Sequence, residues 1–205
     1  MKRLALAFVF LVSAALCIPG TASAQGTGGV HFGLSGGADF PVSDQKDVYK
    51  TGWNGTVLIP INFGTAPVGI RFDGSYHELK TQTDLQAFFL GDGRTRIISA
   101  TADVVIGPRN TSVEPYFIGG VGGYDLRFRG QDITTGNAFS QSTTRFGWNA
   151  GVGIAFPLGD RSSSSRFFIE GRYTSVTVDA DRFSNSVHRG GTRFTFVPVN
   201  AGFIF

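Results

Sequence analysis

The chain has 205 residues and a net charge of +3, and it is rich in glycine (29 residues) and phenylalanine (20 residues). Its only cysteine, Cys17, lies in the N-terminal segment, so no disulfide framework can hold the rest of the chain together. The charge falls to +1 if Lys2 and Arg3 leave with that segment, and this balance gives no indication of a nucleic-acid partner.

The first 24 residues have the three parts of a secretory signal peptide. Lys2 and Arg3 supply a positive start, residues 4–16 an apolar core, and residues 22–24 (Ala-Ser-Ala) a small-residue cleavage site. The apolar run is shorter than the roughly 20 residues that a membrane helix needs. We therefore expect residues 1–24 to be a cleaved signal peptide and the mature chain to begin at Gln25.

From residue 30 onward, apolar and polar residues alternate in eight stretches. Successive side chains of a strand point to opposite faces, so each stretch has one apolar face and one polar or small face. The stretches cover residues 30–40, 51–63, 68–78, 96–106, 113–128, 145–156, 167–175 and 193–205. The fifth is the least regular because of its glycines at 119, 120, 122 and 123, and its second half sets Tyr124, Leu126 and Phe128 opposite Asp125 and Arg127.

Short turns and long polar loops connect these stretches in alternation. The shorter connections are residues 64–67, 107–112 and 157–165, and the longer ones are residues 41–50, 80–95, 129–144 and 176–192. Bacterial outer-membrane barrels join an even number of strands in this way, with short periplasmic turns and long external loops. The pattern predicts an all-β fold: an eight-stranded antiparallel up-and-down transmembrane β-barrel over residues 25–205.

Alternation alone does not distinguish this barrel from a soluble lipocalin-like barrel, which also has eight strands. Charges in the middle of the stretches favour the membrane, because an arginine that faces lipid at the midplane costs roughly 2–4 kcal/mol. We expect these charges to point inward and pair with one another. The expected interior charge network consists of Asp39, Arg71, Asp73, Asp103, Arg145, Glu170 and Arg172.

Aromatic residues gather near the ends of the stretches, as they do in the interfacial girdles of membrane barrels. We expect Phe40, Trp53, Phe128 and Phe146 at one rim and Phe63, Phe156, Phe167 and Phe205 at the other.

Three prolines interrupt the alternation. Pro60, Pro115 and Pro198 fall inside stretches, where each removes a backbone hydrogen-bond donor. We expect a bulge or a local break at each of them.

Several segments resemble the small outer-membrane β-barrel family of OmpX-, OmpW- and opacity-protein-like proteins. They are residues 114–122 (EPYFIGGVG), 151–156 (GVGIAF), 170–173 (EGRY) and the aromatic C-terminal end. The resemblance implies insertion into the outer membrane, contact with its lipid and lipopolysaccharide, and recognition by the barrel-assembly machinery. In this family a terminal Phe with apolar residues at alternate positions before it is the assembly signal, which here corresponds to Val199, Ala201, Phe203 and Phe205.

Catalytic and metal-binding interpretations have weak support. Ser75 and His77, like Ser186 and His188, have the spacing of a nucleophile and a base, but residues i and i+2 of any strand share a face. No nucleophile elbow accompanies them. Residues 179–181 (Asp-Ala-Asp) and 91–93 (Gly-Asp-Gly) have too few ligands for a calcium site. We expect no catalytic residue, cofactor or metal.

Our first hypothesis for function is a non-enzymatic outer-membrane barrel with a structural or surface-interaction role. Apolar residues in the long loops are its expected contact points: Val48, Tyr49, residues 85–90, Phe139 and Phe183. A narrow porin is the main alternative, since many inward positions are glycine and leave room for a thin passage. A lipid-modifying enzyme and a soluble periplasmic carrier are further alternatives.

Overall fold

The computed structural model describes residues 28–64, 66–82, 93–109, 111–131, 138–159, 165–177 and 193–205, with backbone only for residues 130–131 and 138–141. The predicted signal peptide lies outside these ranges. Among the described residues, no helix is long and apolar enough to cross a membrane.

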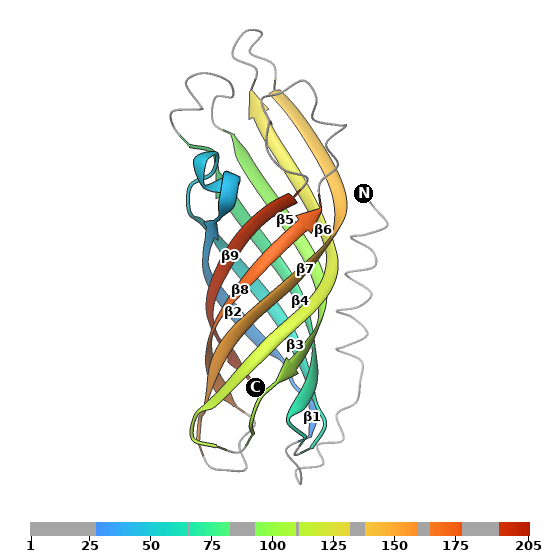
Figure 1. Ribbon diagram of the computed structural model, residues 1–205, viewed down its shortest axis with the longest axis vertical. Helices are drawn as coiled ribbons and strands as arrows, with labels where there is room; N and C mark the ends of the chain where they lie inside the picture. Colours follow the sequence, from blue (N-terminus) through green and yellow to red (C-terminus); the bar gives the residue numbers. More distant parts are fainter. Residues whose placement is uncertain are drawn as a thin grey trace.

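The described strands form one closed antiparallel barrel (Figure 1). Each of β2 to β9 pairs with its neighbours in sequence, and β9 pairs with β2, which closes an eight-stranded barrel. A short strand, β1, pairs with β3. The strands are β1 (Gly29–Val30), β2 (Gly33–Pro41), β3 (Gly52–Asn62), β4 (Val68–Lys80), β5 (Arg94–Ile106), β6 (Glu114–Gln131), β7 (Ala138–Pro157), β8 (Arg166–Thr177) and β9 (Arg193–Ile204). The predicted fold class is thus confirmed.

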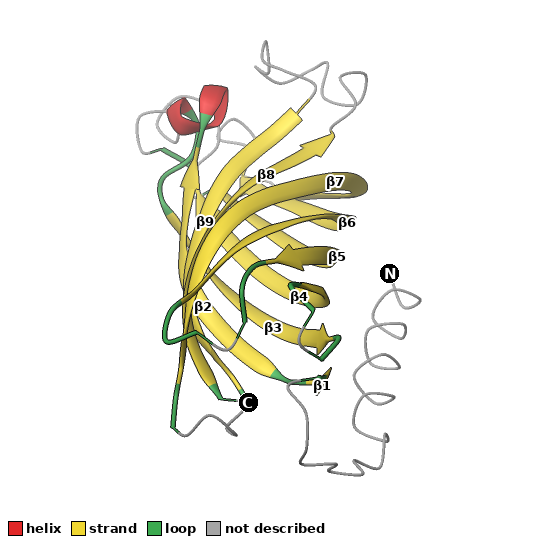
Figure 2. Cartoon of the chain, turned by 60° about the horizontal axis from the view of Figure 1, so that its bottom comes forward, coloured by secondary structure: helices red, strands yellow, loops and turns green. Residues whose placement is uncertain are grey.

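The two ends of the barrel differ as the connection lengths predict. The C-terminus and the short turns lie at the bottom in Figure 1, and a one-turn 3-10 helix, η1 (Ser43–Asp47), lies at the opposite end (Figure 2). The longest described strands, β6 and β7, extend toward the η1 end. We refer to these ends as the short-turn end and the long-loop end.

Each strand pair keeps a single register, and two of the three prolines interrupt the pairing. Between β1 and β2, His31 lies opposite Pro60 and Phe32 opposite Ile59, and the strand pairing is broken there on this side of β3 alone, although His31 N–H donates to the Pro60 carbonyl at 2.8 Å. Pairing between β8 and β9 stops opposite Pro198 and resumes at Phe196. The prediction is wrong for Pro115, which pairs with Ile154 without a break because it is the second residue of β6 and lies at the strand's end.

Apolar side chains cover the outside of the barrel, and polar ones point into it. Large apolar side chains are exposed on the outer surface of the barrel, among them Phe72, Val121, Trp148, Val152 and Ile154. The side chains between them in sequence are buried in the lumen, as two-residue periodicity requires. The soluble-barrel alternative requires the reverse arrangement and is wrong.

The second half of β6 departs from the expected phase. Tyr124 and Leu126 are buried, and Phe128 packs against the same internal cluster, so the apolar face here points inward. The expectation that Phe128 belongs to the outer aromatic rim is therefore wrong. Phe117 and Val121 face outward in the first half of the strand, so the apolar residues change face across Gly122 and Gly123.

Candidate functional site

The centre of the lumen holds a connected group of five charged side chains from β4, β5 and β8. Arg71 donates to Glu170 Oε1 from Nη2 at 2.8 Å and to Asp73 Oδ2 from Nε at 3.2 Å. Arg172 donates to Glu170 and to Asp73, and its Nη1 lies 3.3 Å from Asp103 Oδ2. All five residues are buried, so water screens these contacts little.

Uncharged groups complete the hydrogen bonding of the carboxylates. Asn149 Nδ2 donates to Asp103 Oδ1 at 2.7 Å, and Thr101 Oγ1 donates to Asp103 Oδ2 at 2.8 Å. Tyr116 Oη donates to Glu170 Oε2 at 2.8 Å. These donors partly replace the water that buried carboxylates have lost.

The two other members of the expected network lie elsewhere in the lumen. Asp39 in β2 accepts a hydrogen bond from Asn54 Nδ2 at 2.9 Å and lies 3.0 Å from His77 Nδ1. Arg145 is partly buried on the inward face of β7, where it is paired in register with Tyr124.

His77 therefore has a carboxylate partner rather than the serine that its spacing suggests. Ser75 Oγ instead lies 2.9 Å from Thr56 Oγ1. A ring contact with Phe196, at 5.1 Å between centroids, covers His77 on the side of the long loops. The second serine–histidine pair, Ser186 and His188, and residues 179–181 lie outside the described residues. Within the described residues, no group of three potential metal ligands occurs.

Inward glycines make room for large side chains on neighbouring strands. A methyl group at Gly153 would collide with the Tyr116 ring, and one at Gly147 would lie 2.7 Å from Tyr124 Cε2. Methyl groups at Gly120 and Gly151 would collide with Asp103 and with the β8 backbone, respectively. Neighbouring groups therefore fill the space at these inward positions, which the narrow-porin alternative requires for a thin passage.

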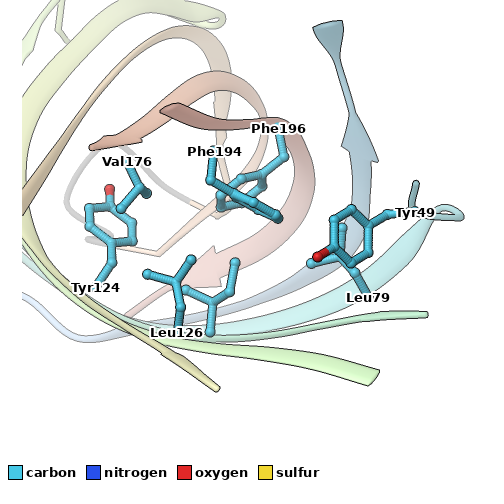
Figure 3. Packing of buried hydrophobic residues seen from close by; sticks show 8 residues of the cluster. Tyr49, Leu79, Tyr124, Leu126, Val176, Phe194 and Phe196 are labelled. Atoms are coloured by element: carbon cyan, nitrogen blue, oxygen red, sulfur yellow. The ribbon is translucent and has the colours of Figure 1, made fainter. Parts of the chain in front are cut away.

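An apolar cluster closes the lumen toward the long loops. We call it the upper plug; it consists of Tyr49, Leu79, Ile97, Tyr124, Leu126, Val176, Phe194 and Phe196. Figure 3 shows these side chains converging inside the barrel from several strands. The Phe194 ring lies 5.5 Å from that of Tyr49 and 5.8 Å from that of Phe196, in edge-to-face arrangements.

Tyr49 enters the upper plug from the loop between β2 and β3. Only 5% of its surface is exposed, and burial raises the pKa of its phenol although a hydrogen bond with Thr95 opposes this. The expectation that Tyr49 is an external contact point is wrong, because its ring is packed on Phe194. Val48 also packs against the plug; residues 85–90 and Phe183 lie outside the described residues, as does the side chain of Phe139.

A smaller apolar cluster lies below the charges, toward the short-turn end. Leu58, Ala155 and Phe168 are its buried members, and the Arg71 guanidinium carbon lies 5.9 Å above the Phe168 ring. A cavity of about 70 Å³ lies at this level, lined by Arg71, Arg109, Glu114 and Arg166 among others, and another of about 30 Å³ lies in the charged layer, again with Arg71 in its wall. The lumen thus holds a charged layer between the upper plug and a level at which the smaller apolar cluster and a cavity with charged residues in its wall lie side by side.

The C-terminal residues lie on the outer surface of the barrel wall. Val199, Ala201, Phe203 and Phe205 are exposed, while the side chains between them point inward. The backbone of Phe205 pairs with that of Phe32, with N–H···O distances of 2.7 and 3.3 Å, which continues the seam between β2 and β9.

Comparison with known proteins identifies the same architecture. A family described as "Outer membrane protein beta-barrel domain" matches residues 8–205 of the chain. A comparison with curated proteins found no match to the chain.

The chain is similar to solved structures of small outer-membrane barrels. Neisserial surface protein A is 13% identical over 85% of this chain and 95% of its own, with a TM-score of 0.55. A major outer membrane protein from Thermus thermophilus is 14% identical over 86% and 98%, with a TM-score of 0.55. Ail from Yersinia pestis, solved with the heparin analogue sucrose octasulfate, is 17% identical over 86% and 97%, with a TM-score of 0.51. At these identities the similarity concerns the fold alone.

Proposed function

Since the chain belongs to the family of outer membrane protein β-barrel domains, we propose that it is a sealed, non-enzymatic barrel whose external surface carries its role. The outer membrane is its location. The observation that supports the proposal is the upper plug, an apolar cluster inside the lumen above the charged layer, because a barrel that is closed to solutes can act only through what it presents outside.

A conducting barrel needs a continuous polar path, which the upper plug opposes. Leu79, Ile97, Leu126, Val176 and Phe196 are completely buried in the upper plug. An eight-stranded interior is just wide enough to be filled by side chains. The two cavities lined by Arg71 have room for about five to seven and about two to three water molecules, since one water needs about 10–15 Å³.

Planar bilayers test whether the barrel is sealed. We expect the purified mature protein to give no unitary conductance, and a variant with a thinned plug, Tyr49→Ala/Phe194→Ala, to give measurable current. Trp148→Ala, which removes an exposed ring from the outer wall, is the matched control and should remain silent. Steady conductance by the unaltered protein would overturn the proposal in favour of the narrow porin.

The proposed partners are those of an envelope protein. Outer-membrane lipid and lipopolysaccharide would surround the exposed apolar belt, and the barrel-assembly machinery would bind the C-terminal residues during biogenesis. Lipid A profiles that change on deletion of the gene and are restored by the intact chain, but not by His77→Ala, would instead indicate a lipid-modifying enzyme.

A further inference from the structure

Five cations gather on the outer wall of β4, β5 and β6 near the long-loop end. We call this the basic patch; it consists of Lys80, Arg94, Arg96, Arg127 and Arg129. The neighbouring residues Leu79, Thr95, Ile97 and Leu126 are buried in the lumen, so alternation places the patch on the outside. The three strands lie side by side (Figure 1).

The strand register sets these cations directly opposite one another. Arg94 is paired with Lys80 on one side and with Arg129 on the other, and Arg96 is paired with Arg127 one row below. Like charges at directly opposed positions destabilise a sheet. Anions bound beside these rows would therefore stabilise the sheet by offsetting the repulsion between the cations.

Carboxylates on the outer wall supply only part of the negative charge that would neutralise the five cations. Glu78 accepts from Arg96 Nε at 3.1 Å and lies 3.7 Å from Arg94 Nη1, so two arginines share it. Asp125 accepts from Arg127 Nη2 at 2.7 Å. Within the described residues, no carboxylate contacts Lys80 or Arg129. Five cations thus face two carboxylates.

The patch lies directly beside the apolar belt. The next outward residues toward the short turns are Tyr76 and Ile98, and Trp53 is paired with Glu78 in the row of Arg96 and Arg127. The Trp53 and Tyr76 rings lie 5.4 Å apart at this level, where aromatic residues mark a membrane interface. An anion that reaches the patch from this belt is a lipid headgroup.

We propose that the basic patch binds the phosphate groups of an outer-leaflet glycolipid of the lipid A type. Guanidinium groups bind phosphate through paired N–H donors, and unshared cations at the interface are available to do so. The site rests on the orientation proposed above, in which the long loops face outward. It gives the barrel a fixed lipid contact on one side of its wall.

Native mass spectrometry of the folded mature protein with diphosphoryl lipid A tests the site. Each basic residue near a membrane surface contributes enough for about a fivefold change in affinity, so Arg94→Gln/Arg129→Gln should weaken binding by about 10- to 30-fold. Asp125→Asn removes a competing carboxylate and should strengthen it. Heat-dependent gel mobility verifies that each variant is folded.

Arg193→Gln is the matched control, because Arg193 is an exposed arginine at the same end of the barrel but on β9. It should change the affinity less than twofold. Equal losses in Arg193→Gln and in Arg94→Gln/Arg129→Gln, or equal binding of dephosphorylated lipid A by the unaltered protein, would overturn the proposal. So would tighter binding of soluble heparin than of lipid A. A barrel that conducts but keeps the lipid A contact would overturn the proposed function and leave this site standing.

Discussion

Arg172 contacts three carboxylates in the lumen, those of Asp73, Asp103 and Glu170, whereas Arg71 contacts two. The charged layer holds two guanidinium groups and three carboxylates. Removing one partner of a buried ion pair costs much more than the pair contributes, since the remaining charge stays buried. The consequences of losing Arg172 therefore depend on the carboxylates left behind.

We predict that Arg172→Leu destabilises the folded barrel by about 3–5 kcal/mol, as expected for an uncompensated buried charge. Glu170→Gln alone should cost less, because it leaves two cations with two carboxylates. The double variant should cost less than the sum of the two, since Glu170→Gln removes one of the charges stranded by the loss of Arg172. Urea unfolding of the detergent-solubilised barrel measures the change in unfolding free energy of all three variants. A loss in the double variant equal to the sum of the two single losses would contradict the predicted coupling.

Gly120 lies on the inward face of β6, where a methyl group would collide with the Ala102 carbonyl oxygen and with the Asp103 carboxylate. We predict that Gly120→Ala destabilises the barrel by about 1–3 kcal/mol, the usual cost of overpacking. Gly123→Ala is the control, because a Cβ there meets nothing within 4 Å. Equal unfolding midpoints for the two variants would contradict this explanation.

Alternation in the sequence is sufficient to predict that the seven charges point inward, but not which of them meet. Arg71 and Glu170 are 99 residues apart, and their contact depends on the order and register of five strands. His77 and Asp39 meet in the same way, across β3. The contact of Tyr116 with Glu170 cannot be predicted from the sequence, because tyrosine has both an apolar ring and a polar hydroxyl and is found on the outer and the inner face of a barrel.

At the scale of the strand, β6 crosses two environments. Its first half has lipid outside and charges inside, whereas its second half has Arg127 outside and Leu126 in the upper plug. An alternating stretch carries no mark of the point at which the solvent outside changes from lipid to water. The direction of Tyr124 and Phe128 was therefore predicted wrongly, although the strand itself was predicted correctly.

We predict that changing a charge on the outer face of β6 has different effects on stability in its two halves. Val121→Arg places a charge in the lipid belt and should cost roughly 2–4 kcal/mol. Arg127→Val removes a partly exposed ion pair with Asp125 and one cation of the basic patch, and it should cost less than about 1 kcal/mol in vesicles that contain no lipid A. Folding titrations in lipid vesicles measure both, and a tolerated Val121→Arg would place the membrane boundary below that residue.

At the scale of the whole molecule, connection lengths and strand count were sufficient to predict the closed barrel and its two unlike ends. The upper plug is not predictable from the sequence, because it depends on the packing of Tyr49, from the loop between β2 and β3, on Phe194. A loop tyrosine of this kind looks the same in sequence as one that contacts a partner. The inward glycines suggested space that Tyr116 and Tyr124 occupy from the neighbouring strand.

The last residue gives a prediction that separates the stability of the barrel from its assembly in the cell. Phe205 continues the β2–β9 seam through its backbone alone, while 59% of its surface is exposed. We predict that Phe205→Ala refolds in detergent with an unchanged unfolding midpoint but reaches the outer membrane at a reduced level, as follows from the proposal that the assembly machinery binds the C-terminal residues. Phe63→Ala is the control, since it removes a similarly exposed ring from the same rim, outside the C-terminal pattern. Equal outer-membrane levels of the two variants, measured by fractionation, would show that the terminal ring carries no assembly signal.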